Sequence, residues 1–167
     1  MTDDPVYVLD ANVFIQAARR YYAFDLAPAF WRALVHHASE GRVQSIDRVL
    51  RELERGKDEL SQWAKSSFHQ WFASTAENDV IEAYRKIMAW VQGQSQFSDA
   101  AKAEFANGAD GWLIAYAQAK GRVVVTHEQR DPGIKRKIPI PNVCEAFGDV
   151  PFIDTFEMLR AMGVRLG

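Results

Sequence analysis

Short apolar runs alternate along the chain with longer stretches in which apolar residues recur at helical spacing. Residues 6–9 and 123–125 form apolar or β-branched runs that are too short for helices, so they predict buried strands. The short segment 43–45 predicts a brief second strand, and 151–153 predicts an edge strand. Helical patterns cover 13–20, 28–41, 47–56, 60–71, 80–91, 99–105, 110–120, 143–147 and 154–162. Strands that alternate with helices predict an α/β fold, in which a central parallel sheet is flanked by helices on both faces.

The middle of the chain carries two stripes of large apolar side chains. One includes Trp63, Phe68 and Trp71, and the other runs over 80–91. Aromatic residues at helical spacing usually belong to the core, so we expect both stripes to be buried. A lid or a partner-binding surface is the alternative interpretation.

Composition and length narrow the class of protein. The 167 residues are 48% hydrophobic and 25% charged, which is typical of a globular chain and predicts one domain over 1–167. The single cysteine, Cys144, cannot form an internal disulfide. The acidic start of the chain is unlike a signal peptide and no apolar run is long enough to cross a membrane, so we expect a cytoplasmic protein. The net charge of −2 requires any site for a polyanion to be local.

Acidic residues occur at the predicted strand ends, which is where open parallel sheets bind ligands. Asp10 ends the first strand, Glu128 follows the strand 123–125, and Asp110 begins a helix. Turn formation or helix capping would explain each of them separately. Glu52 and Glu54 both flank the apolar stripe of the helix 47–56, and periodicity does not choose between them.

Four segments that carry these acids occur in the order seen in one nuclease family. They are Leu-Asp10-Ala-Asn12-Val, Arg-Glu52-Leu, Ala-Asp110-Gly-Trp-Leu-Ile and Val-Thr126-His-Glu128. Together they resemble the PIN-domain nucleases, especially the small VapC-type toxins, over nearly the whole chain. The resemblance implies a three-layer PIN-like fold and a cytoplasmic endoribonuclease that acts as the toxin of a type II toxin–antitoxin pair. A small antitoxin partner that covers the active site and a homodimer are implied in the same way.

The resemblance also implies a role for each acid. Asp10 and Asp110 would bind Mg²⁺ or Mn²⁺ directly, and Glu52 and Glu128 would complete the site or hold its water. Hard divalent cations prefer such oxygen ligands, and they promote phosphodiester hydrolysis by activating water and offsetting phosphate charge. Asn12 and Thr126 would orient the acids through hydrogen bonds, although turn formation would also explain them.

The fourth acidic position departs from the family pattern. Aspartate is common two residues after the position of Thr126, whereas this chain has Glu128 there. Asp131 is a substitute, but Asp131-Pro-Gly is also typical of an ordinary turn. We favour Glu128 because of its register. His127 is a candidate general base or phosphate contact, and an imidazole without either role is the plainer interpretation.

Two groups of residues are candidates for binding RNA. Arg130, Lys135, Arg136 and Lys137 form a dense basic cluster directly after the acidic segment, where they would bind phosphates beside the cleaved bond. A solvated loop would look the same. Arg19, Arg20, Tyr21 and Tyr22 form a second candidate contact through charge and stacking.

Other functions were weighed against the nuclease. A PIN-like scaffold or RNA-binding protein without catalysis would tolerate the altered fourth acid. A phosphatase-like hydrolase would use Asp10 as a phosphoryl acceptor. The spacing of His36 and His37 does not suit a helical zinc site, and no Gly-X-Ser-X-Gly motif indicates a serine hydrolase.

Overall fold

The computed structural model describes residues 4–167, in which the strands form one parallel sheet. The strand order is β3-β2-β1-β4-β5, so β1 lies at the centre between β2 and β4. The strands span Tyr7–Leu9 (β1), Val43–Ile46 (β2), Phe72–Ala73 (β3), Val123–Val125 (β4) and Phe152–Ile153 (β5). The expected parallel sheet, with residues 152–153 at one edge, is therefore confirmed.

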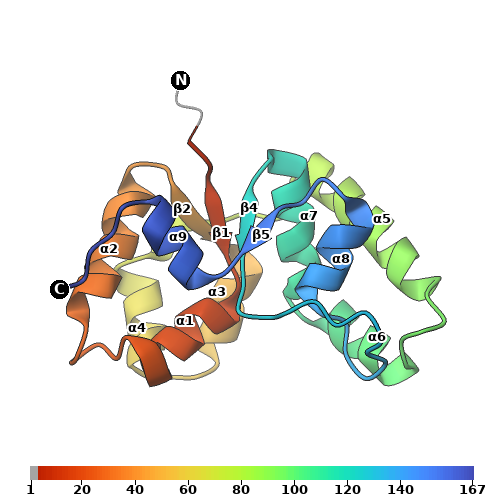
Figure 1. The fold of residues 1–167 in the computed structure, drawn as a ribbon, viewed down its shortest axis with the longest axis horizontal. Helices are drawn as coiled ribbons and strands as arrows, with labels where there is room; N and C mark the ends of the chain where they lie inside the picture. The colour runs from red at the N-terminus through yellow and green to blue at the C-terminus, as the bar shows by residue number, and fades with distance from the viewer. Residues whose placement is uncertain (1–3) are drawn as a thin grey trace.

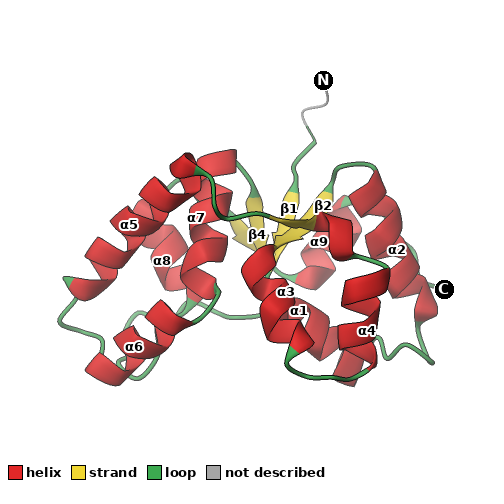
Figure 2. Cartoon of the chain, turned by 180° about the vertical axis from the view of Figure 1, so that it is seen from behind, coloured by secondary structure: helices red, strands yellow, loops and turns green. Residues whose placement is uncertain are grey.

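Helices cover the sheet from two sides, as the front and back views show (Figure 1, Figure 2). Helices α5 to α8 lie on one side of the strands, and α2, α4 and α9 lie on the other. Their bounds are Ala11–Gln16 (α1), Pro28–Ser39 (α2), Asp47–Glu54 (α3), Glu59–Ser66 (α4), Asn78–Gln92 (α5), Asp99–Asn107 (α6), Asp110–Lys120 (α7), Ile140–Phe147 (α8) and Thr155–Ala161 (α9). None of the helices in the described part combines the length and the apolar character that crossing a membrane requires.

Local differences from the sequence prediction occur where distant contacts decide the backbone. The stretch 60–71 is not one helix, because α4 ends at Ser66 and a 3-10 turn follows at His69–Trp71. The unpredicted strand β3 comes next, and it exists because Phe72 and Ala73 pair with Ser45 and Ile46 of β2. A two-residue strand carries almost no periodic signal of its own.

Asp47 is the first residue of α3 and not its cap. The N-cap is Ile46, and Asp47 instead accepts hydrogen bonds from the N–H and the hydroxyl of Thr75, at 3.2 and 2.9 Å. The acid therefore joins α3 to the segment after β3, which is a tertiary contact that its place in the sequence does not reveal.

The aromatic stripe around Trp63 and Phe68 belongs to the core, as expected. The ring of Phe68 is fully buried and lies 5.7 Å from the ring of Phe14 and 5.1 Å from that of Trp63, measured between centroids. Phe72 of β3 packs on the same rings. These aromatic side chains therefore hold α1, α4 and β3 together, and they do not form a lid.

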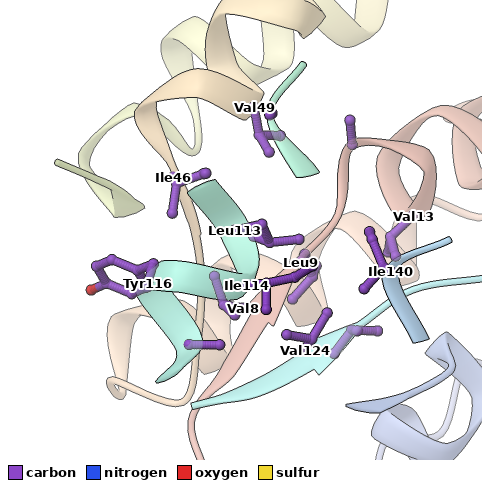
Figure 3. Close-up of a cluster of buried hydrophobic side chains, with 14 of the residues drawn as sticks. Val8, Leu9, Val13, Ile46, Val49, Leu113, Ile114, Tyr116, Val124 and Ile140 are labelled. Atoms are coloured by element: carbon purple, nitrogen blue, oxygen red, sulfur yellow. The ribbon is translucent and has the colours of Figure 1, made fainter. Parts of the chain in front are cut away.

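Helix α7 lies across the central strands and supplies much of the buried core between helix and sheet (Figure 3). Leu113 and Ile114 are fully buried, together with Val8 and Leu9 of β1 and Val124 of β4. Burial of such side chains stabilises the fold by about 1.5–3 kcal/mol each. The first turn of α7 is thereby held against the carboxyl ends of β1 and β4.

Gly111 lets two aromatic rings approach the start of α7. A Cβ at this position would lie 3.0 Å from Phe105 of α6 and 3.1 Å from Tyr84 of α5. These distances are shorter than ordinary carbon contacts, so a side chain here would push the rings away. The close packing positions Asp110, the neighbouring residue, at the meeting point of three helices.

Candidate functional site

A cavity of about 470 Å³ opens beside the carboxyl ends of the central strands, and we call it the carboxylate cavity. Each of the four acids expected from the sequence comes to its wall from a different part of the fold. Asp10 follows β1, Glu52 lies on α3, Asp110 begins α7, and Glu128 follows β4. Residues separated by more than a hundred positions thus line one cavity, because parallel strands end at the same edge of the sheet.

Asp10 is the most deeply buried of the four acids, with 2% of its surface exposed. Its backbone N–H donates to the carbonyl of Val125 at 3.0 Å, which continues the pairing of β1 with β4. The hydroxyl of Thr126 donates to Asp10 Oδ2 at 3.0 Å. The side chain is thereby fixed in its orientation, as expected for Thr126.

The environment of Asp10 disfavours its charged form. Burial raises its pKa to about 7, and the negative charges of Glu128 and Glu52 act in the same direction. The hydrogen bond from Thr126 lowers the pKa and offsets only part of this effect. A buried acid in this situation is stabilised as an anion if a cation is bound nearby.

Asp110 is in the same electrostatic situation as Asp10. Burial raises its pKa well above the ordinary value, and the charges of Asp10, Glu128 and Glu52 raise it further. Asp110 is not the cap of α7, because the N-cap residue is Ala109. The simple capping role suggested by the sequence is therefore wrong, and the carboxylate lines the cavity instead.

The structure distinguishes Glu52 from Glu54. Glu52 lines the cavity, and its Oε1 accepts a hydrogen bond from the backbone N–H of Ala109 at 3.1 Å. Glu54 is not among the residues that line the cavity. One hydrogen bond thus joins the acid of α3 to the residue that precedes Asp110.

A second contact holds the two helices that carry Glu52 and Asp110. The guanidinium of Arg48 on α3 lies 4.0 Å from the centre of the Trp112 ring on α7. The ring of Tyr84 is also stacked on this indole, with 3.7 Å between the ring centroids. Cation–π contacts of this kind stabilise by about 0.5–2 kcal/mol, so this pair helps to keep α3 and α7 in register at the cavity.

Glu128, rather than Asp131, faces the cavity. Glu128 Oε1 accepts from the N–H of Ile140 at 2.9 Å, and the N–H of Glu128 donates to the hydroxyl of Thr126 at 3.1 Å. Asp131 is exposed, and its backbone exchanges hydrogen bonds with the side-chain amide of Asn142. The turn interpretation of Asp131 therefore describes its position.

The basic cluster divides into residues at the cavity and residues away from it. Lys137 lines the cavity, and its Nζ lies 3.5 Å from Glu128 Oε2. Arg130 forms an ion pair with Glu145 and borders a neighbouring cavity. Lys135 and Arg136 are exposed on the same loop, outside the wall of the carboxylate cavity.

His127 lies beside the carboxylate cavity but does not line it. Its Nε2 is 2.9 Å from the hydroxyl of Thr155. Burial lowers the pKa of His127, so the imidazole is neutral at pH 7. A structural role for this ring agrees with the plainer interpretation of the sequence.

Sequence reasoning missed three polar residues of the cavity wall. Arg55 follows α3, and Glu104 and Asn107 belong to α6. Nothing in the local sequence of α6 indicates a site, although Asn107-Gly108 marks the point where the chain turns toward Asp110. The position of Glu104 and Asn107 depends on the packing of α6 against α7.

The acids surround the cavity without forming a closed metal cage. Within residues 4–167, no three His, Cys, Asp or Glu side chains are close enough to hold an ion by themselves. The donors in the cavity wall are nevertheless the carboxylate oxygens that hard cations prefer. Such a set is suited to an ion that retains part of its water.

The family of the chain follows from comparison with family models. The model described as "Domain of unknown function (DUF4411)" matches residues 7–166. The chain belongs to this family. The match to DUF4411 includes all four acids of the carboxylate cavity. None of the curated proteins matches this DUF4411 chain.

Two solved structures contain chains that fold in the same way as this DUF4411 chain. One match is a chain in the crystal structure of VapBC2 from Rickettsia felis, which was solved bound to a DNA fragment from the VapBC2 promoter. The TM-score is 0.54 and the identity 13%, over 89% of this chain and 98% of that chain. A chain of FitAcB from Neisseria gonorrhoeae matches with a TM-score of 0.54 and 20% identity over 89% of this chain and 96% of that chain. The likeness is one of fold, and it confirms the predicted three-layer, PIN-like architecture.

Proposed function

We propose that this DUF4411 chain is an endoribonuclease that hydrolyses phosphodiester bonds with the help of Mg²⁺ or Mn²⁺. The observation that carries the proposal is the convergence of Asp10, Glu52, Asp110 and Glu128 on one cavity of a PIN-like sheet. The resemblance of the four sequence segments to PIN-domain nucleases supports the same function.

The residues of the cavity fit a hydrated divalent cation. Mg²⁺ usually binds one or two carboxylates and keeps several water molecules, so it needs no cage of protein ligands. The pKa values of Asp10 and Asp110 are raised first by burial and then by the charges of the neighbouring acids, and Lys137 offsets part of the effect at Asp110. Asp10 and Asp110 would hold the ion directly, and Glu52 and Glu128 would contact it through water.

The chain's own groups would then position the substrate and the acids. Thr126 holds Asp10 through its hydroxyl, and Ile140 holds Glu128 through its backbone N–H. Lys137, whose Nζ lies 3.5 Å from Glu128 Oε2, would bind a phosphate beside the cleaved bond. The cation, when bound, activates water and offsets the charge that develops on the phosphate.

The nuclease proposal predicts cleavage that depends on a divalent cation. The purified chain is incubated with a mixture of structured and unstructured RNA in Mg²⁺, in Mn²⁺ and in EDTA. We expect discrete products with either metal and none with EDTA, because the acids alone repel the phosphate. Products that persist in EDTA, or intact RNA under all three conditions, would contradict the proposal.

We also propose that the chain is the toxin of a toxin–antitoxin pair. The support is the resemblance to VapC-type toxins, together with the common fold of the VapBC2 and FitAcB chains. Expression of the chain in a bacterial host should arrest growth, and co-expression of the small protein encoded beside it should restore growth. Normal growth at an expression level that yields active nuclease would contradict this role.

A further inference from the structure

An exposed aromatic residue lies next to the carboxylate cavity, and no step of the proposed hydrolysis uses it. Helix α1 continues as a π-helical turn, Ala17–Tyr21, in which the N–H of Tyr22 donates to the carbonyl of Ala17 at 2.8 Å. Tyr21, at the end of this turn, has 50% of its surface exposed. An exposed aromatic ring offers a flat apolar face to a ligand, and contact with that face removes it from water. An exposed ring beside a cavity is therefore a candidate for binding.

The two neighbouring tyrosines have separate tasks. The ring of Tyr22 is stacked on that of Phe30 at 4.4 Å, and its carbonyl accepts from the indole N–H of Trp31 at 2.7 Å. Tyr22 is therefore part of the packing, and its expected role in RNA contact is not supported by its position. It anchors the turn that presents Tyr21.

Tyr21 belongs to a small aromatic platform. Its ring centroid is 5.7 Å from that of His127 and 5.6 Å from that of Phe156, which meets it edge to face. The hydroxyl of Thr155 holds the imidazole from the other side. Because neighbours on other elements fix these rings, little side-chain freedom is lost when a flat ligand stacks on the platform.

The platform borders two cavities that adjoin the carboxylate cavity through shared wall residues, and we call the three cavities together the trough. Asn12 and Glu128 line both the carboxylate cavity and an adjoining cavity of about 300 Å³, which Arg20 and Tyr21 also line. That second cavity shares Tyr21 and His127 with a third one of about 470 Å³ that reaches Phe156. A polymer that has one of its residues at the four acids would therefore have the next residue beside Tyr21.

The charges along the trough determine which part of a nucleotide suits which place. Arg20 is exposed beside Tyr21, where its guanidinium can contact a phosphate. Asp154 and Glu157 line the third cavity and repel phosphate, and Arg130 on the same wall is already paired with Glu145. The flat, largely uncharged base is therefore the part that suits the platform.

We propose that Tyr21, with His127 and Phe156, forms a stacking site for an unpaired base next to the cleaved phosphate, so that the enzyme acts on single-stranded polynucleotide. In an A-form duplex the faces of the bases are covered by their neighbours, and an aromatic side chain reaches them only in single strands. The inference rests on the proposed nuclease function, since it places the cleaved phosphate at the four acids.

Replacing Tyr21 with alanine should weaken the binding of single-stranded RNA by about tenfold or more, the usual effect of losing one aromatic stacking partner. Binding is measured by fluorescence anisotropy in an Asp110→Asn background with Mg²⁺, so that cleavage does not consume the probe. A 2-aminopurine base in the probe reports stacking directly, because its fluorescence falls when it stacks. Tyr21→Phe should retain both signals, since it keeps the ring.

Leu26→Ala is the matched control, because Leu26 has 82% of its surface exposed but does not line the trough. It should bind RNA as the parent does. A single-stranded DNA and an RNA duplex of the same sequence complete the set of probes. A Tyr21-dependent signal with RNA alone or with both single strands supports the site and identifies the polymer, whereas duplex binding that is equally tight and equally sensitive overturns it.

Cleavage kinetics separate this inference from the nuclease proposal. In the otherwise unchanged enzyme, Tyr21→Ala should raise KM for single-stranded RNA by about tenfold and leave kcat nearly unchanged. Cleavage with an unchanged KM would overturn the stacking site and leave the nuclease proposal standing. Absence of cleavage by the parent protein would overturn the nuclease proposal, while the binding measurements would still show whether the platform stacks a base.

Discussion

Replacing Asp110 with asparagine is expected to lower RNA cleavage by at least about 100-fold, because loss of a residue that merely supports a metal ligand already costs about 10–100-fold. The substitution keeps the size of the side chain and removes its charge. Asp110 shares the cavity with Asp10, Glu52, Glu104 and Glu128, so the loss of one charge weakens the attraction for a divalent cation. The rate of product formation at fixed Mg²⁺ concentration measures the effect.

Asp131→Asn provides the matched control for Asp110→Asn. It makes the same chemical change on an exposed loop outside the carboxylate cavity. We expect this variant to cleave RNA as fast as the parent. Equal activity of Asp110→Asn and the parent would show that the cleavage comes from elsewhere or from a contaminant, and the proposed site would be wrong.

The metal-free protein should be less stable at pH 8 than near pH 4. In the unfolded chain Asp10 loses its proton near pH 3.8, whereas in the folded protein its pKa is about 7. Between these values the folded state binds more protons, so the free energy of unfolding falls as pH rises. The difference corresponds to about 4 kcal/mol for Asp10, and the raised pKa of Asp110 acts in the same direction.

Urea unfolding in EDTA at several pH values, followed by tryptophan fluorescence, measures this pH dependence. Asp10→Asn should flatten the curve and should exceed the parent in stability at pH 8, since asparagine carries no charge and its carbonyl still accepts from Thr126. Asp131→Asn should leave the curve as it is in the parent. If the free energy of unfolding of the parent did not change between pH 4 and pH 8, the raised pKa of Asp10 would be contradicted.

Adding Mg²⁺ or Mn²⁺ at pH 8 should raise the free energy of unfolding of the unmutated protein. A ligand that binds only the folded state at 100 times its Kd stabilises by about 2.7 kcal/mol. The same metal should have a much smaller effect on Asp10→Asn, which has lost a ligand. This measurement tests cation binding without any RNA, and so it separates a failure to bind metal from a failure to cleave.

The sequence by itself determined most of the elements and their order. Strands β1 and β4 are apolar runs whose length excludes helices, and α3, α5 and α7 have clear helical spacing. Asp10 and Glu128 were found because they follow such strands directly. These features depend on neighbouring residues, which is why they can be predicted from sequence.

The tertiary structure decided which of two similar residues, close together in the sequence, lies at the site. Periodicity places Glu52 and Glu54 alike beside one apolar stripe, and only the packing of α3 against the start of α7 brings Glu52 to Ala109. Tyr21 and Tyr22 are equally aromatic in the sequence, yet Phe30 and Trp31 bury one of them and leave the other exposed.

The raised pKa of Asp10 likewise depends on residues far away in the chain. Burial in the folded protein and the charges of Glu128 and Glu52 produce it, and neither acid is a near neighbour of Asp10 in sequence. The two-residue strand β3 exists only because β2 offers it a partner. A sequence pattern describes local preference, whereas burial, electrostatic coupling and strand pairing are properties of segments that folding brings together.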